Sequence, residues 1–397
     1  MPFDPQKTPS WSFTLPFALA LMAPFDILAS LAMDIYLPVV PSMPAILQTT
    51  PSMVQLTLSL YMVMLGVGQL IFGPLSDRIG RKPVLLGGGV VFALSSFALA
   101  ATDSATLFVA LRFTQSVGAS AALVATFATV RDVYANRPEG ATIYGLFSAM
   151  LSFVPAIGPI AGALIASGFG WRAIFMTLGL LGLIATGRAY RHWPETRPEC
   201  TGANNANTLK ILKDFPFWTY TLGFGTAMGT FFVFFSTAPR ILIERGGYGE
   251  TEFSLAFASV ALVMIAATRL LSRHTRKWGV RKSVALGMVV LLASALALLL
   301  TEQLLLPSFA SLIAPMWLGA IGIVLTASMT ANGALAAFDD SAGMAVALYF
   351  CIQSLMVSLA GTVLVILLPG DTAWPLIAFC TVMPLVVLTM LARLQRS

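Results

Sequence analysis

The chain has 397 residues, of which 57% are hydrophobic and 10% carry a charge, and its mean hydropathy is +0.85. A soluble domain carries about 25% charged residues, so this composition excludes a water-soluble protein and predicts a chain that lies largely in lipid. The net charge of +6 does not indicate a nucleic-acid partner, because Lys and Arg cluster in short loops between apolar runs. The three cysteines lack the spacing of a metal site or a disulfide framework, so we expect no metal and no cofactor.

Apolar runs recur along the whole sequence. A helix that crosses a bilayer needs about 20 mostly apolar residues, and twelve runs are of about that length, several of them with the Pro or Gly that membrane helices tolerate. In chain order these predicted spans are residues 13–37, 53–72, 84–101, 106–130, 141–166, 171–189, 216–239, 253–271, 283–301, 308–331, 343–368 and 373–392. The N-terminus lacks the basic region and cleavage site of a signal peptide, so we expect the first span to be retained.

The basic residues orient these spans. If both termini are cytoplasmic, nineteen of the 23 Lys and Arg residues lie in inside segments and three in outside segments, while Arg112 lies within a span. Basic residues favour the cytoplasmic side of a membrane. The sequence therefore predicts a multi-pass protein with both termini in the cytoplasm.

The longest polar interruption, residues 191–214, divides the chain into six spans and six spans. It is rich in Pro, Asn and Thr, as linkers are. Similar basic loops with Gly follow the second span of each half, "SDRIGRKP" at 76–83 and "RHTRKWGVRKS" at 273–283. Weak internal repeats of this kind are typical of secondary transporters. We expect an all-α membrane protein of two six-helix bundles, residues 1–190 and 215–397, joined by a cytoplasmic linker.

Three charged side chains lie well inside predicted spans: Asp26 and Asp34 in the first and Arg112 in the fourth. A charge in the bilayer costs at least about 2.5 kcal/mol, so it should face a partner or a water-filled cavity. On a helix the two aspartates lie about 12 Å apart along the axis and point about 80° apart, and Arg112 has a depth between theirs. The pattern predicts a charge network suited to proton exchange, because burial and a nearby Arg shift the pKa of a carboxyl group in opposite directions. The alternatives are a structural ion pair between the two spans and, for Asp34, a solvated position near the outer end.

Three sequence motifs carry a family resemblance. "GPLSDRIGRKPVLL" (73–86) resembles the loop signature of the major facilitator superfamily, and "LRFTQSVGAS" (111–120) resembles its fourth-span signature, with Ser116 where Gly is usual. "AIGPIAGALI" (156–165) is similar to the fifth-span signature of the antiporter branch, with Ala163 in place of a Gly. The resemblance implies a transporter of two bundles that opens alternately to either side of the membrane.

The chemistry of these motifs suggests gating. Asp77 can accept hydrogen bonds from the positive N-terminus of a neighbouring helix or pair with Arg131, whereas a loop that only orients the protein does not need Asp77. Small residues in the fifth span allow close helix approach and Pro bends a helix, although ordinary packing also accounts for Gly162. The expected gating residues are Gly73, Asp77, Arg78, Gly80, Arg81, Arg131, Gly158, Pro159 and Gly162.

A narrower resemblance covers nearly the whole chain. "MAPFDILASLAMDIYLPVVP", "VATFATVRDVYANRPEG" and "MGTFFVFFSTAPR" resemble the bacterial chloramphenicol and florfenicol exporters. The resemblance implies an inner-membrane exporter, expected to act as a monomer, that exchanges an amphenicol antibiotic for protons and takes its energy from the proton gradient. It also implies that Asp26, Asp34 and Arg112 take part in proton coupling.

Drug pockets are lined by aromatic and apolar groups with few polar ones. The run "FFVFFSTAPR" (231–240) can supply rings on which an aromatic drug stacks, although its four Phe residues cover most of a helix circumference and at least two must face lipid or packing. Interface anchoring is the alternative for Tyr36. The drug-contacting residues we expect are Asp26, Tyr36, Tyr61, Phe231, Phe235, Tyr349 and Gln353.

Other functions remain open on the same fold, since a fold does not fix a function. A broader multidrug exporter and a proton-linked importer of a small nutrient are the alternatives. The sequence has no metal-ligand cluster, no nucleophile–base pair and no nucleotide-binding loop, which disfavours a membrane enzyme or receptor.

Overall fold

The computed structural model describes residue 11 and residues 13–134, 139–197, 208–338 and 342–394. Every regular element in these ranges is helical. The first half of the chain forms α1 (Leu15–Asp34), η1 (Leu37–Ser42), α2 (Met43–Ile46), α3 (Pro51–Ile79), α4 (Arg81–Ala101), α5 (Ala105–Tyr134), α6 (Glu139–Phe169) and α7 (Trp171–His192). The second half forms α8 (Thr208–Lys213), α9 (Phe215–Pro239), η2 (Arg240–Arg245), α10 (Glu250–Leu304), α11 (Phe309–Leu335), α12 (Ala342–Leu367) and α13 (Trp374–Arg393).

The all-α membrane fold expected from the apolar runs is confirmed. In the described part of the chain, eleven helices are long and apolar enough to cross a membrane, and the shorter apolar segment Phe153–Phe169 lies within α6. The element α10 holds two predicted spans, because Gly279, with φ 76°, interrupts the helical backbone between them. Each of the twelve predicted spans thus falls on a helix.

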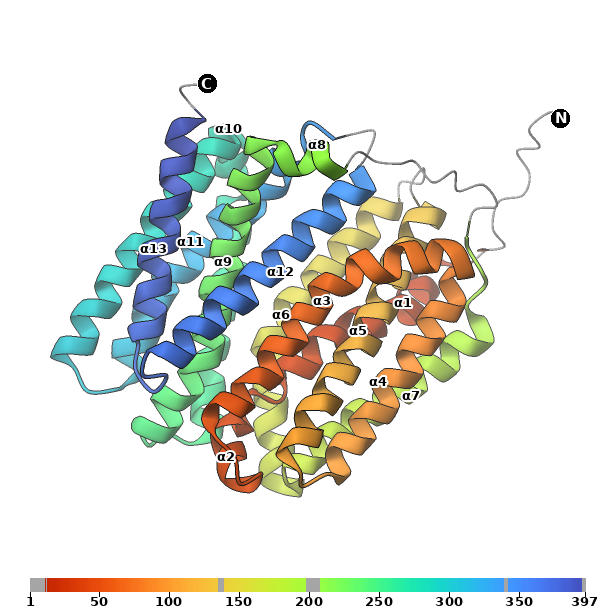
Figure 1. Ribbon diagram of the computed structural model, residues 1–397, viewed down its shortest axis with the longest axis horizontal. Coiled ribbons are helices and arrows are strands. Elements are labelled where there is room, and N and C mark those ends of the chain that lie inside the picture. The colour runs from red at the N-terminus through yellow and green to blue at the C-terminus, as the bar shows by residue number, and fades with distance from the viewer. Residues whose placement is uncertain (1–10, 12, 135–138, 198–207, 339–341, 395–397) are drawn as a thin grey trace.

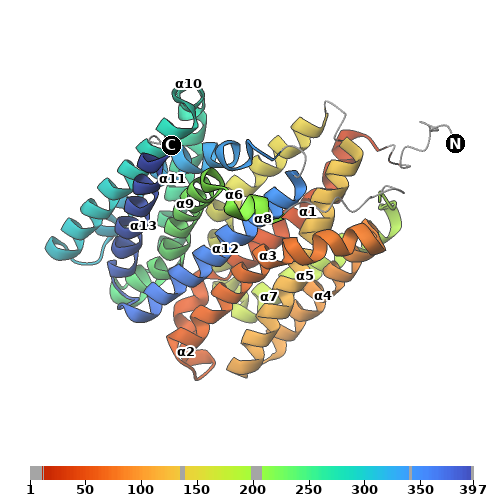
Figure 2. The same ribbon diagram turned by 45° about the horizontal axis from the view of Figure 1, so that its top comes forward.

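The two halves lie side by side. In Figure 1, α3, α4, α5 and α7 occupy one side, and α9, α11 and α13 the other. Figure 2 shows from a second angle that α12 of the second half lies along α3 of the first. The short helices mark opposite ends: α2 lies at the bottom of Figure 1 and α8 at the top. We call these the α2 end and the linker end.

The predicted 76–83 loop is mostly helical. The helix α3 continues through Asp77 to Ile79, and α4 begins at Arg81, so Gly80 alone makes the turn. Its φ of 110° lies in the left-handed region, where a residue with a Cβ is strained. The linker also differs from a plain polar connection, because it contains α8.

Candidate functional site

The helix α1 carries both aspartates in the interior of the first half. It ends at Asp34 because Pro38 has no N–H to donate to the Asp34 carbonyl and its ring crowds that carbonyl. Asp26 is 1% exposed and Asp34 6%. Neither carboxylate has a hydrogen bond or an ion pair within the described residues. Burying a carboxyl group without a hydrogen bond or an ion pair is costly, and such groups in membrane helices are typical of functional sites.

Arg112 of α5 is fully buried and surrounded by rings. Its guanidinium lies 4.7 Å from the ring centre of Tyr61, 5.2 Å from Tyr36 and 5.9 Å from Phe175. Cation–π contacts of this length stabilise a desolvated cation by about 2 kcal/mol or more. The rings come from the turn between α1 and η1, from α3 and from α7, so this cage holds the Arg112 charge inside the first half.

Hydrogen bonds complete the Arg112 environment. Nη1 donates to the carbonyl of Ala32, at 3.1 Å, and to Oε1 of Gln115, at 2.5 Å. Ala32 belongs to the last turn of α1, whose carbonyls lack helical partners. Nε and Nη2 have no hydrogen-bond partner in the part of the chain that the structure describes. Arg112 lies beyond 4.0 Å of both aspartates, so the charge network expected from the sequence is not a set of direct ion pairs here. The role of the three residues in proton coupling stays a prediction.

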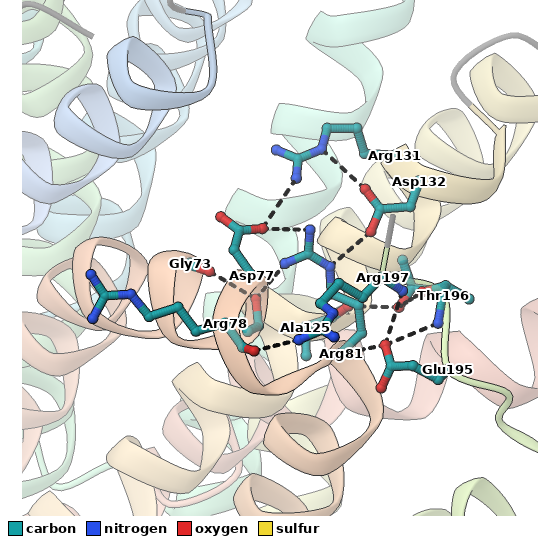
Figure 3. Close-up of polar contacts among 12 residues, drawn as sticks. Gly73, Asp77, Arg78, Arg81, Ala125, Arg131, Asp132, Glu195, Thr196 and Arg197 are labelled. Atoms are coloured by element: carbon teal, nitrogen blue, oxygen red, sulfur yellow. Dashed lines mark hydrogen bonds and ion pairs between the residues drawn. The ribbon is translucent and has the colours of Figure 1, made fainter. Parts of the chain in front are cut away.

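The signature residues at the linker end form an ionic cluster (Figure 3). Arg81 is buried and pairs with Asp77, at 2.6 Å, and with Asp132 of α5, at 2.7 Å. Arg131 approaches Asp77 at 4.0 Å and Asp132 at 3.6 Å. The expected Asp77–Arg131 proximity is therefore present, and Arg81 does more than orient the protein. Sequence reasoning missed Asp132, although a carboxylate next to a basic residue at the end of a span was a usable signal.

Two other signature residues are less engaged. Arg78 is exposed, and only its carbonyl takes part, as an acceptor from Arg197. A Cβ on Gly73 would meet nothing within 4 Å, so this state gives no steric reason for Gly there.

The fifth-span motif packs on the end of α1. A Cβ on Gly158 would lie 2.8 Å from the Asp34 Cβ, and one on Gly162 would clash with the Ile35 carbonyl oxygen. The Pro159 carbonyl accepts a hydrogen bond from Ser254 of α10, at 3.1 Å. The motif thus packs against Asp34 in the first half and accepts a hydrogen bond from Ser254 in the second half.

Hydrogen bonds between the halves gather at the α2 end. Gln55 donates to Ser236 at 3.1 Å, Ser358 donates to the Ser59 carbonyl at 2.8 Å, and Ser59 and Thr362 share a hydroxyl hydrogen bond. Together with Ser254–Pro159, these are the cross-half hydrogen bonds of the described residues. We call them the α2-end seal.

The phenylalanine run of α9 is largely packed. Phe231, Phe234 and Phe235 have ring contacts with Phe257 of α10, the closest at 5.2 Å between the centres of Phe234 and Phe257. Phe235 is 1% exposed, whereas Phe231 keeps part of its surface accessible. Phe235 is thus fully packed in this state, and drug contact by Phe231 stays a prediction.

The polar groups expected at the drug site are buried. The Tyr61 hydroxyl donates to the Ala29 carbonyl at 2.8 Å, and the Tyr349 hydroxyl bonds Thr330 at 2.9 Å. The Tyr349 ring stacks on Phe224 at 5.0 Å. Gln353 is 6% exposed and accepts from Ser354. The structure thus separates these residues into an Arg112 group, with Tyr36 and Tyr61, and a second-half group on α9 and α12. Drug contact by any of them stays a prediction.

The sequence profile of the Major Facilitator Superfamily matches residues 25–361. The chain belongs to the major facilitator superfamily. It is 49% identical over 383 residues to the chloramphenicol resistance protein of Pseudomonas aeruginosa, an alignment that covers 96% of this chain and 91% of that one. It is 28% identical over 255 residues to the multidrug resistance protein MdtL of Escherichia coli O157:H7, covering 64% and 63% of the two chains.

A solved structure shares the fold. The bacterial homologue of the human lysosomal transporter Spinster, crystallised in an inward-facing and occupied conformation, superposes with a TM-score of 0.75 over 97% of this chain and 98% of that one, at 14% sequence identity. By its family and its apolar helices, the protein is a multi-pass membrane transporter of this superfamily and not an enzyme.

Proposed function

We propose that this transporter exports amphenicol antibiotics such as chloramphenicol and florfenicol across the bacterial inner membrane in exchange for protons. The relative named as a chloramphenicol resistance protein supports the drug class. The observation that supports the proton coupling is the pair of buried carboxyl groups, Asp26 and Asp34, which form no ion pair with any residue that the structure describes. In this account the proton gradient is the energy source, both termini are cytoplasmic, and one chain suffices for transport.

The transport cycle follows from the two ends of the molecule. The α2-end seal joins the two halves at one end. At the other end, the ionic cluster of Asp77, Arg81, Arg131 and Asp132 forms its ion pairs within the first half alone. With the termini inside, this state is sealed toward the exterior. Reopening it requires that the seal break and that the linker ends of the two halves meet. For this reason we assign the ionic cluster to gating.

Exchange demands that drug and protons disfavour each other's binding, which is a negative coupling free energy. Protonation of Asp26 removes the negative charge of its side chain from α1. Deprotonation restores that charge, and a bound drug must then accommodate it. Protons entering from outside would neutralise the site and favour outward release of drug. Their release inward would then reset the transporter.

Drug accumulation in cells tests this proposal. Bacteria that express the chain should accumulate several times less labelled chloramphenicol than cells with an empty vector, and a protonophore should abolish the difference. Equal accumulation in the two strains, at confirmed expression, would contradict drug export. A difference that survives the protonophore would contradict proton coupling.

The similarity to MdtL favours one alternative, a multidrug exporter with a wider substrate range. A panel of chemically unrelated drugs in the same accumulation assay separates the two. Protection against amphenicols alone supports the narrow assignment, whereas protection against unrelated cationic or macrocyclic drugs supports the wider one.

A further inference from the structure

The start of the linker is hydrogen-bonded to the turn at Gly80, between α3 and α4. Residues 193–197, which we call the strap, follow α7 and cross the linker ends of α3, α4 and α5 (Figure 3). Glu195 is the centre of the strap. One of its carboxylate oxygens accepts from the backbone N–H of Arg81 at 2.8 Å and the other from that of Lys82 at 3.2 Å.

These bonds satisfy the beginning of α4. The first N–H groups of a helix have no partner within the helix, and the partial positive charge there favours a carboxylate. The helix has no side-chain cap from its own N-cap residue, Gly80. Glu195, more than a hundred residues later in the chain, supplies the missing cap.

The rest of the strap reinforces this attachment. The Arg197 guanidinium donates to the Arg78 carbonyl, in the last turn of α3, where a positive charge is favoured. The Thr196 hydroxyl donates to that of Thr129 on α5, at 3.3 Å. Glu195 also accepts from the backbone N–H groups of Thr196 and Arg197, which keeps the strap in one conformation.

Gly80 is shaped to the strap as well as to the turn. A Cβ on Gly80 would clash with the carboxylate oxygen of Glu195 that accepts from Lys82. Besides its positive φ, this position therefore leaves no room for a side chain while Glu195 is bound.

We propose that Glu195 is a positioning residue of the gate at the linker end, which holds the start of α4 so that the Arg81 side chain bridges Asp77 and Asp132. Arg81 makes both contacts: its backbone N–H donates to Glu195, and its guanidinium pairs with Asp77 and Asp132. Only residues 198–207 separate the strap from α8, which directly precedes α9, the first helix of the second bundle. Within the described residues of the inter-half connection, the strap contacts the gate through Glu195 and Arg197. The inference rests on the gating role assigned above and is independent of which drug is carried.

Turnover of purified protein in liposomes tests the inference. Chloramphenicol transport is measured per folded protein, as judged by gel filtration, for Glu195→Ala, Glu195→Gln and a matched control. Loss of a helix N-cap shifts a local equilibrium by about fivefold. We expect Glu195→Ala to lower the maximal rate by about that factor with an unchanged KM, and Glu195→Gln, which keeps an acceptor oxygen, to fall between. Glu139→Gln, a charge loss at the exposed start of α6, should transport normally.

A double variant identifies the route of the effect. If Glu195 acts through Arg81, Glu195→Ala should add nothing to Arg81→Ala, since coupled residues are non-additive. Independent, additive losses would overturn the inference, and so would a normal maximal rate in Glu195→Ala. A further comparison uses Asp77→Asn. If Asp77→Asn fails and Glu195→Ala is normal, only the role of Glu195 falls, whereas normal transport by Asp77→Asn removes the gating role and this inference with it.

Discussion

Gly158 of α6 lies directly against Asp34 of α1, so that a Cβ on Gly158 would stand 2.8 Å from the Asp34 Cβ. A residue of the fifth-span motif therefore packs closely against the Cβ of an aspartate proposed for proton coupling. The same motif reaches the second half through the Pro159 carbonyl and Ser254. A change of charge at Asp34 is thus placed to affect the contact between the halves.

Gly158→Ala should disrupt this contact. The added methyl group forces α1 and α6 apart, and overpacking of this kind costs about 1–3 kcal/mol. We expect lost chloramphenicol transport and a lower unfolding temperature in detergent. Gly168→Ala is the matched control on the same helix, because its Cβ would meet nothing within 4 Å. Normal transport by Gly158→Ala would show that the close approach is unimportant.

Arg112→Lys tests the aromatic cage. Lysine keeps the positive charge but loses the planar group that donates to Ala32 and Gln115 and lies against three rings. A loss of about 2 kcal/mol in cation–π energy predicts at least about a tenfold slower transport in vesicles. The control is Arg172→Lys, since Arg172 also lies over a ring, that of Trp171, but is solvent-exposed. Unchanged transport by Arg112→Lys would mean that charge alone matters.

Removal of hydroxyls from the α2-end seal should open that end. A lost hydrogen bond is worth about 1 kcal/mol, or about fivefold in an equilibrium. With the native cysteines replaced by Ser and a reporter introduced by Thr237→Cys, whose native hydroxyl bonds its own helix, we expect Ser59→Ala combined with Thr362→Ala to speed alkylation by an impermeant maleimide about fivefold. Thr381→Ala, whose hydroxyl bonds only its own helix, is the control. Equal rates in all three backgrounds would contradict the seal.

Asp132→Asn tests the ionic cluster. Arg81 is buried between Asp132 and Asp77, and removal of one partner leaves part of its charge unpaired. We expect a maximal transport rate lowered about as strongly as in Asp77→Asn. Asp103→Asn is the control, since Asp103 also pairs with an arginine, Arg172, but at the exposed α2 end. If Asp132→Asn transports like that control, the cluster is not part of the gate.

The sequence predicted the fold from physical constraints that act locally. Bilayer thickness sets the length of apolar runs, and so the twelve spans fell on helices despite the interruption of α10 at Gly279. The rarity of charges in spans likewise identified Asp26, Asp34 and Arg112. Helical periodicity gives the direction of a side chain but not its neighbours. For that reason the ring of Phe175 beside Arg112 was not foreseen.

Contacts between distant segments were the main omissions. Glu195 lies in a stretch whose composition is typical of a linker, and nothing local indicates that it caps a helix more than a hundred residues earlier. Asp132 was overlooked beside Arg131 because its partner, Arg81, lies on another helix. The sequence predicts a loop over residues 76–83, but in the structure Gly80 alone makes the turn, because glycine can adopt its positive φ.

Proton exchange itself is the central claim, and inverted membrane vesicles test it most directly. A pH gradient is imposed, a fluorescent probe reports it, and chloramphenicol or florfenicol is added to vesicles with the native chain or with Asp26→Asn. The account predicts that drug partly collapses the gradient in native vesicles and has no effect in the variant at equal protein amounts. A gradient unaffected by drug, in vesicles that demonstrably transport it, would contradict proton antiport.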